Sequence, residues 1–347
     1  VLLPQEKSSQ DPKQLTMKSR RATLKSLAAL TAGLLVPTKG IGGNLFPPSD
    51  KFGELLPLRL LGKTGEKVTM LGLGGAHIAR CDEKTAEAQI ECAIDGGIRF
   101  FDNAYTYGNG LAEERYGKFL APKYRDVSFI MTKTTAESGK KAQVELERSL
   151  KRMKLDHVDL WQIHSVRNPK DVDTRLEQEV LEVFRKAKES GKAKYIGFTG
   201  HTDFNAHKRM LERTNILETC QMPINCFDPS YKSFINNVLP TLVEKEMGIL
   251  AMKTLSNGGF FGGTSHFEGG KNPKIIPNVV SVREAIHFVW SLPVSTLITG
   301  ANDVEMLQEK IDLAKSFKKM NEKSRMELVD RVGNADLDGA KVEFYKA

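Results

Sequence analysis

The chain has 347 residues, 40% of them hydrophobic, so it can bury a large core, either as one α/β barrel of about 250 residues or as two domains. Its net charge of +8 is concentrated near the N-terminus, because residues 1–40 hold seven Lys or Arg against two acidic residues. The remaining +3 is too small an excess to indicate a nucleic-acid partner.

The first predicted element is an export signal within residues 1–40. Arg20 and Arg21 precede an uncharged stretch at residues 26–36, and this order of charged, apolar and small residues is typical of a secretory signal. The paired arginines resemble the twin-arginine motif, with Thr23 where Phe is usual. Eleven uncharged residues are fewer than the roughly 20 that a membrane span takes. We expect the twin-arginine export machinery as a partner and a periplasmic or otherwise exported location, with a cytoplasmic one as the alternative.

The next segments divide the chain into a linker, a body and a tail. Met17 lies just before Lys18, so residues 1–16 are interpreted as possible upstream residues that do not belong to the protein itself. Residues 41–57 are rich in Gly and Pro and are interpreted as a linker. Residues 58–317 are predicted to form the body, which opens with a β-hairpin that caps the barrel floor and turns at Thr64 and Gly65. Residues 318–347 are predicted to be a helical tail packed outside the body.

The body alternates short apolar runs with segments of helical period. Continuous apolar strands that alternate with helices indicate a parallel sheet covered on its faces. A doubly wound open sheet is the competing fold, but no GxGxxG motif follows a first strand. Eight units instead predict an α/β fold of the (β/α)8 TIM-barrel type. The predicted strands are residues 68–75, 98–102, 128–133, 158–164, 195–200, 219–225, 248–253 and 296–300.

Four polar side chains at or just after successive predicted strands form a candidate catalytic group. Asp102, Lys133 and His164 end three strands, and Tyr107 follows in a glycine-rich loop. In such a barrel the C-terminal strand ends meet at one face, where active sites lie. A lysine beside a phenol is expected to lower the tyrosine pKa from about 10 toward the working range. A tyrosine of this kind suits protonation of an oxygen that gains charge as hydride reaches carbon.

The body resembles the aldo-keto reductase family over residues 58–315. The resemblance implies a (β/α)8 barrel that binds NADPH, or less often NADH, with Asp102, Tyr107, Lys133 and His164 as the catalytic four and Tyr107 as proton donor. It also implies that Thr199 and Gln221 hold the nicotinamide carboxamide. The matching motifs are residues 58–75, 96–108, 131–133, 159–164 and 196–201.

The cofactor site implied by this resemblance departs from the family pattern at two positions. Met252 stands where an aromatic residue often stacks on the nicotinamide, and Met306 stands where NADPH-preferring relatives often have Arg, so NADP and NAD both stay open. Backbone N–H groups of Leu255, Ser256, Gly258 and Gly259 are expected to meet the pyrophosphate. The predicted cofactor-binding residues are Gly75, Thr199, Gln221, Met252, Lys253, Leu255, Gly258, Gly300, Asn302 and Lys310.

His77, Asn103 and Trp161 are predicted to contact a hydroxylated, sugar-like carbonyl or alcohol substrate. Residues 254–280 are predicted to form a lid over the cofactor. We expect no metal site, because the spacing of the four cysteines and seven histidines suggests none. A non-enzymatic nicotinamide-binding sensor or partner module, and a non-redox lyase or isomerase on the same barrel, remain the alternatives. The oligomeric state is not predicted.

Overall fold

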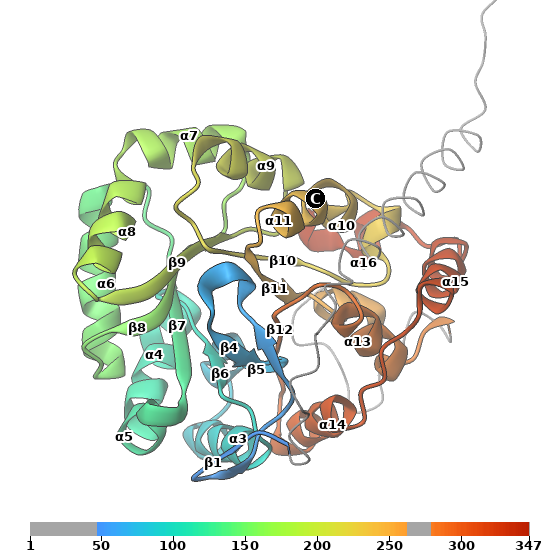
Figure 1. Cartoon of the computed structure of the whole chain (residues 1–347), viewed down its shortest axis with the longest axis horizontal. Helices are drawn as coiled ribbons and strands as arrows, with labels where there is room; N and C mark the ends of the chain where they lie inside the picture. The colour runs from blue at the N-terminus through green and yellow to red at the C-terminus, as the bar shows by residue number, and fades with distance from the viewer. Residues whose placement is uncertain (1–46, 262–278, 347) are drawn as a thin grey trace, which may run out of the picture.

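The computed structural model describes residues 47–261 and 279–346. The predicted export signal and most of the predicted lid, including Phe267, lie outside the described residues. Eight parallel strands close into a barrel in the order β10-β11-β12-β5-β6-β7-β8-β9, which confirms the predicted fold class (Figure 1). The strands are β5 (Leu71–Gly74), β6 (Phe100–Asp102), β7 (Phe129–Thr134), β8 (Val158–Ile163), β9 (Ala193–Thr199), β10 (Thr219–Pro223), β11 (Gly248–Met252) and β12 (Thr296–Thr299).

Helices connect successive strands and cover the outside of the barrel (Figure 1). Side-chain caps fix several helix starts: Asp82 accepts from the Thr85 N–H at 2.8 Å, and Ser281 forms a reciprocal capping box with Glu284. Within residues 47–261 and 279–346, no helix has the length and apolar character needed to cross a membrane. The helices between the barrel strands are α2 (Gly75–Ile78), α3 (Glu83–Asp95), α4 (Leu111–Arg115), α5 (Ala121–Tyr124), α6 (Gly139–Met153), α7 (Pro169–Glu177), α8 (Val180–Glu189), α9 (Phe204–Arg213), α10 (Phe234–Asn237), α11 (Leu239–Glu244) and α13 (Val282–Trp290), and α14 (Val304–Lys315) follows β12.

The hairpin of β3 (Leu58–Leu60) and β4 (Lys67–Thr69) closes the end of the barrel opposite the C-terminal strand ends. Its connection contains Gly62 and Gly65 with positive φ, and a Cβ on Gly62 would lie 2.4 Å from the backbone nitrogen of Gly248 at the start of β11. Leu61 is fully buried and belongs to a separate apolar cluster inside the barrel. That cluster contains Leu61, Val68, Phe100, Met131, Leu160 and Leu250.

Part of the segment predicted as a linker is folded against the barrel. β1 (Ser49–Asp50) and β2 (Gly53–Glu54) pair as a short antiparallel hairpin. The Asp50 carboxylate accepts from the Arg99 guanidinium at 2.6 Å and 2.9 Å, and Leu56 is buried. Composition alone missed this contact, because Gly and Pro mark a tight hairpin as readily as a linker.

The C-terminal tail contains the predicted extra helix and a further docked segment. α15 (Glu322–Gly333) lies within residues 318–347, where a helical tail was predicted, and α16 (Gly339–Val342) and the 3₁₀ turn η7 (Phe344–Lys346) follow it. These last elements return to the loops after β10 and β11, and the chain end lies near α10 (Figure 1). The end of the tail therefore lies beside the C-terminal ends of the strands, which the sequence did not indicate.

Candidate active site

Four side chains predicted from the strand ends meet at one end of the barrel. The Lys133 ammonium donates to Asp102 Oδ1 at 2.5 Å and to the Tyr107 hydroxyl at 3.3 Å. It also donates to the Asn103 backbone carbonyl at 2.7 Å, so partners are present for all three of its N–H bonds. The rings of Tyr107 and His164 meet edge to face with their centroids 5.7 Å apart. The structure thus brings Asp102, Tyr107, Lys133 and His164 together.

A left-handed turn places Tyr107 over Lys133. Gly108, Asn109 and Gly110 all have positive φ within the 3₁₀ segment η2 (Tyr107–Gly110). A Cβ on Gly108 would lie 2.7 Å from the Cβ of Ala79, so glycine serves both the turn and the close approach. This local geometry explains why two glycines follow the tyrosine so closely.

Burial and neighbouring charges act in opposite directions on the pKa values of Tyr107 and Lys133. Burial raises the pKa of Tyr107 above its ordinary value of 10.0, and the Lys133 ammonium offsets only part of this effect. The expectation of a lowered tyrosine pKa is therefore wrong for this geometry, because desolvation of the phenolate outweighs the neighbouring charge. Burial lowers the pKa of Lys133, but its contacts with the Asp102 carboxylate and the Tyr107 hydroxyl outweigh this effect and the pKa is raised overall. Tyr107 is thus a protonated phenol held beside a permanent cation.

His164 is held in its neutral form. Burial, followed by the charges of Lys133 and other nearby groups, lowers its pKa well below the ordinary value of 6.5. A neutral imidazole has one N–H and can donate a hydrogen bond without carrying charge. His164 is therefore suited to orient a carbonyl oxygen rather than to protonate it.

A cavity of about 440 Å³ opens over these four residues. Nine of the ten predicted cofactor-binding residues line it, as does His77 among the predicted substrate residues. His77 lies against Gly300, since a Cβ on that glycine would be 1.8 Å from His77 Nδ1. The lining residues of the predicted cofactor set are Thr199, Gln221, Met252, Lys253, Leu255, Gly258, Gly300, Asn302 and Lys310.

Three predicted site residues do not line the cavity. Trp161 is fully buried and stacks on Phe184 of α8 at a centroid distance of 3.8 Å, so it faces the helical shell rather than a substrate. Asn103 is also fully buried, and its side-chain oxygen accepts from the Ala104 N–H at 2.9 Å. Gly75 packs against β6, where a Cβ would lie 2.6 Å from the Asp102 carbonyl oxygen. None of these three residues is among those that line the cavity.

The cavity wall fits a nicotinamide carboxamide beside β9 and β10. Thr199 ends β9, and Gln221 lies in β10. The Gln221 side-chain oxygen is buried and has no hydrogen-bond partner among the described residues. A buried acceptor of this kind needs a donor, which a carboxamide NH₂ group would supply.

Two of the backbone N–H groups that were predicted to meet the pyrophosphate are already bonded within the loop after β11. The Ser256 N–H donates to the Lys253 carbonyl at 2.8 Å, and the Gly258 N–H donates to the Leu255 carbonyl at 3.3 Å. Both groups are used within the turn that leads into η6 (Ser256–Phe261). Among the described residues of this loop, Lys253 is a charged residue that lines the cavity.

The start of α14 forms the far end of the cavity with a buried cation. The Lys310 ammonium donates to the Gly300 carbonyl, and burial lowers its pKa to about 8. Asn302 and Met306 line the same end. A single lysine is a weaker partner for the 2′-phosphate of NADPH than an arginine, because it cannot form two parallel hydrogen bonds with the phosphate. NADPH-preferring relatives often have that arginine.

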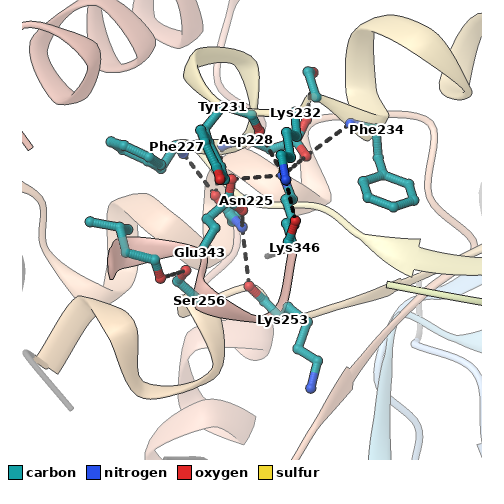
Figure 2. A network of polar contacts seen from close by, with 12 residues as sticks. Asn225, Phe227, Asp228, Tyr231, Lys232, Phe234, Lys253, Ser256, Glu343 and Lys346 are labelled. Carbon is teal, nitrogen blue, oxygen red and sulfur yellow. Dashed lines mark hydrogen bonds and ion pairs between the residues drawn. The ribbon is translucent and has the colours of Figure 1, made fainter. Parts of the chain in front are cut away.

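The prediction missed the contribution of the C-terminus to this region. Asn225 lies two residues after β10, at the end of the predicted strand 219–225, and is not among the predicted site residues. Its side-chain amide donates to the Glu343 carboxylate of the tail at 2.8 Å (Figure 2). It also donates to the Tyr345 hydroxyl of the tail at 3.2 Å. Charged and aromatic residues at a chain end carry no periodic signal, so the sequence could not place them.

Comparison with known sequences identifies one family. The sequence model of the Aldo/keto reductase family matches residues 70–330. The L-glyceraldehyde 3-phosphate reductase of Escherichia coli K12 is 27% identical over 318 residues, covering 76% of this chain and 88% of that protein. The L-galactose dehydrogenase of Arabidopsis thaliana is 28% identical over 221 residues, covering 58% of this chain and 66% of that protein.

Comparison with solved structures supports the fold. The holo form of aldo-keto reductase AKR11C1 from Bacillus halodurans aligns with a TM-score of 0.68 and 20% identity. The alignment covers 83% of this chain and all of that one. The overall fold described above is thus shared with a solved structure.

Proposed function

The chain belongs to the aldo/keto reductase family, a family of NAD(P)-dependent oxidoreductases, and we propose that it reduces a small, hydroxylated carbonyl compound with Tyr107 as proton donor. The observation that carries this proposal is the Lys133 ammonium held between Asp102 and Tyr107 under the cavity. Reduction of a carbonyl by hydride from NADPH or NADH also requires a proton donor at the carbonyl oxygen, and the Tyr107 hydroxyl would provide that proton.

Each of the four side chains has a separate task in this proposal. The bound nicotinamide cofactor supplies the hydride. His164 donates a hydrogen bond to the carbonyl oxygen and orients it toward Tyr107. As the carbon accepts hydride, the oxygen gains negative charge, and the Tyr107 hydroxyl gives it a proton to complete the alcohol. The remaining phenolate is stabilised by Lys133, which Asp102 holds in place.

Exchange of Tyr107 for Phe tests the chemistry directly. Removal of a general acid is expected to lower turnover by about 10²–10⁴-fold, while the dissociation constant for the dinucleotide stays near the wild-type value. Tyr105→Phe is the matched control, because the Tyr105 hydroxyl accepts from Arg148 at 2.9 Å and lies outside the cavity lining. Equal turnover in both variants would refute the role of Tyr107.

The same assay separates the two alternative functions. A nicotinamide sensor or partner module would bind dinucleotide but would oxidise none of it with any carbonyl compound. A lyase or isomerase would convert substrate without added nicotinamide. The intact hydrogen bonds of Lys133 favour the reductase over both, because neither alternative needs a buried phenol beside an ammonium.

The substrate class that we propose is a sugar-like aldehyde or ketone. The relatives are named for L-glyceraldehyde 3-phosphate and L-galactose, and His77 adds a polar side chain to the cavity. His77→Ala is expected to change the ratio of kcat/KM between glyceraldehyde and propanal. An unchanged ratio would remove His77 from substrate recognition and leave the reductase activity in place.

We also propose that the protein is exported by the twin-arginine route, with its dinucleotide inserted before export and retained. The support is the order of Arg20, Arg21 and residues 26–36 in the sequence. The exchange of both arginines for lysine should retain the protein in the cytoplasm, whereas Lys25→Arg should not. Wild-type protein found wholly in the cytoplasmic fraction would contradict the proposal.

A further inference from the structure

The end of the tail is fastened to the loops that follow β10 and β11. We call Val342, Glu343, Tyr345 and Lys346 the C-terminal clasp. The Ser256 hydroxyl donates to the Val342 carbonyl at 2.6 Å, which ties the clasp to the loop after β11. The Lys232 ammonium donates to the Lys346 carbonyl at 2.8 Å, which ties it to the loop after β10 (Figure 2). The clasp thus joins two loops of the catalytic face.

A fully buried ion cluster fixes the clasp. The Lys346 ammonium lies 2.6 Å from Asp228 Oδ1 and 2.6 Å from Glu343 Oε2, and all three side chains are 0% exposed. It also donates to the Tyr231 carbonyl at 3.0 Å. A buried ion pair adds little net stability, because the desolvation of its charges offsets their attraction. Its directional bonds nevertheless allow one arrangement of the loops, which suits a positioning role.

The cluster reaches the cavity through Asn225. The Asn225 amide donates to Glu343 at 2.8 Å and to the Lys253 carbonyl at 3.3 Å. Lys253 has a φ of 59°, a left-handed conformation that costs free energy in a residue other than glycine. A contact to its carbonyl therefore helps to hold the backbone that aims the Lys253 side chain.

Tyr345 gives the Lys253 ammonium an aromatic face. The Lys253 nitrogen lies 5.5 Å from the centre of the Tyr345 ring, and the Tyr345 hydroxyl donates to Glu343 at 2.7 Å. Figure 2 shows the Lys253 side chain pointing away from the ion cluster. Lys253 lines the cavity together with Lys133 and His164. The ring is thus fixed by the clasp and in turn supports the cation.

We propose that the C-terminal clasp positions the Lys253 ammonium as an anion-binding group of the active-site cavity, where it receives a phosphate oxygen of the dinucleotide or of the carbonyl substrate. This inference rests on the proposed function, because that function brings both molecules into the cavity. Four cations line the cavity against the single carboxylate of Asp102, so the described wall favours an anionic ligand. The four cations are Arg80, Lys133, Lys253 and Lys310.

The environment of Lys253 agrees with an anionic ligand. Burial, with a further contribution from the charge of Lys133, lowers the pKa of Lys253 to about 7. An ammonium that is this close to losing its proton gains from an adjacent anion, which stabilises its charged form.

The first experiment compares Lys253→Met with Lys253→Arg. The dissociation constants of NADP⁺ and of inorganic pyrophosphate are measured by calorimetry, without turnover. KM is then measured for glyceraldehyde and for glyceraldehyde 3-phosphate. Loss of a charged hydrogen bond is expected to weaken anion binding about tenfold in the Met variant, with partial rescue by Arg.

The two arms of this experiment identify the source of the anion. Weaker NADP⁺ and pyrophosphate binding assigns Lys253 to the dinucleotide, whereas a higher KM for the phosphorylated substrate alone assigns it to the substrate. Wild-type values in every measurement would overturn the proposal. Because the binding arm needs no turnover, a failure of Tyr107→Phe to abolish reduction would refute the catalytic proposal and leave this one standing.

The second experiment tests the clasp. Lys346→Met is expected to weaken binding of the anion identified in the first experiment about tenfold. The Lys253→Met/Lys346→Met double variant is expected to lose no more affinity for that anion than Lys253→Met alone. Lys341→Met, on the exposed side of the same tail, is the matched control. If the clasp had a merely structural role, Lys346→Met would lower the melting temperature and leave anion affinity at the value of the control. Losses of anion affinity that multiply in the double variant would likewise contradict the positioning role.

A gentler pair of variants covers the case in which Lys346→Met does not fold. Tyr345→Phe keeps the aromatic face and should retain anion affinity, whereas Tyr345→Leu removes the face and should lower affinity by about threefold. Equal affinity in the two variants would overturn the role of the ring.

Discussion

The proton on Tyr107 determines how the reaction should respond to pH. Burial raises the pKa of this phenol above 10.0, so the protonated form that reduction needs persists through the neutral range. We expect kcat for carbonyl reduction to stay level between pH 6 and 9 and to fall only as the pH passes the raised pKa. Alcohol oxidation needs the phenolate and should therefore rise with pH. A decline of the reductive kcat near neutral pH would show that another group controls proton transfer.

Lys310 provides a test of cofactor choice at the other end of the cavity. Its ammonium binds the Gly300 carbonyl beside α14, where the adenosine end of a dinucleotide is expected. Lys310→Met should weaken NADPH binding more than NADH binding, because only NADPH carries a 2′-phosphate that needs a cation. The dissociation constant for NADPH is expected to rise about tenfold in this variant. Equal losses for the two cofactors would place the 2′-phosphate elsewhere.

The residue types at the strand ends were enough to predict which side chains meet. They did not predict how burial changes the pKa values of those side chains. The order of Asp102, Tyr107, Lys133 and His164 along the strands was enough to place them together, because a barrel brings neighbouring strand ends to one face. The direction of the Tyr107 pKa depends on desolvation, which is set by the whole surrounding fold. Trp161 shows the same limit, since only its packing on Phe184 excludes it from the cavity.

Among the elements, the hairpin of β3 and β4 offers a stability test away from the chemistry. Leu61 is fully buried inside the barrel floor, whereas its neighbour Leu60 is 58% exposed. Leu61→Ala should lower the free energy of unfolding by about 2–5 kcal/mol through the cavity that it leaves. Leu60→Ala, the matched control, should change it by less than about 0.5 kcal/mol. Denaturant unfolding measures both, and similar values would mean that the hairpin is not part of the core.

The dinucleotide affinity of the Leu61→Ala protein should match the wild type at temperatures where it is folded. The hairpin lies at the end of the barrel opposite the cavity, and Leu61 is absent from the cavity lining. A large loss of affinity would show that the two ends of the barrel are coupled.

Element boundaries set by tertiary contacts were harder to predict than the elements themselves. Residues 176–189 have a continuous helical period, yet α7 ends at Glu177 and α8 begins at Val180. Glu179 has a φ of 63°, and the Gly139 N–H at the start of α6 donates to the Gln178 carbonyl at 2.7 Å. The break therefore depends on a neighbouring helix, which local periodicity does not report.

On the scale of the whole molecule, one end of the barrel is packed shut while the other keeps a cationic cavity. A ligand that binds only the folded protein raises the free energy of unfolding by about 2.7 kcal/mol at 100 times its dissociation constant. For a chain of this size that corresponds to a rise in melting temperature of about 4 °C. Scanning calorimetry with NADPH and with NADH should show this rise, larger for the preferred cofactor, and Lys310→Met should reduce it for NADPH. If neither dinucleotide shifted the transition at millimolar concentration, the cavity would not be a nicotinamide site, and the hydride chemistry proposed for Tyr107 would have no donor.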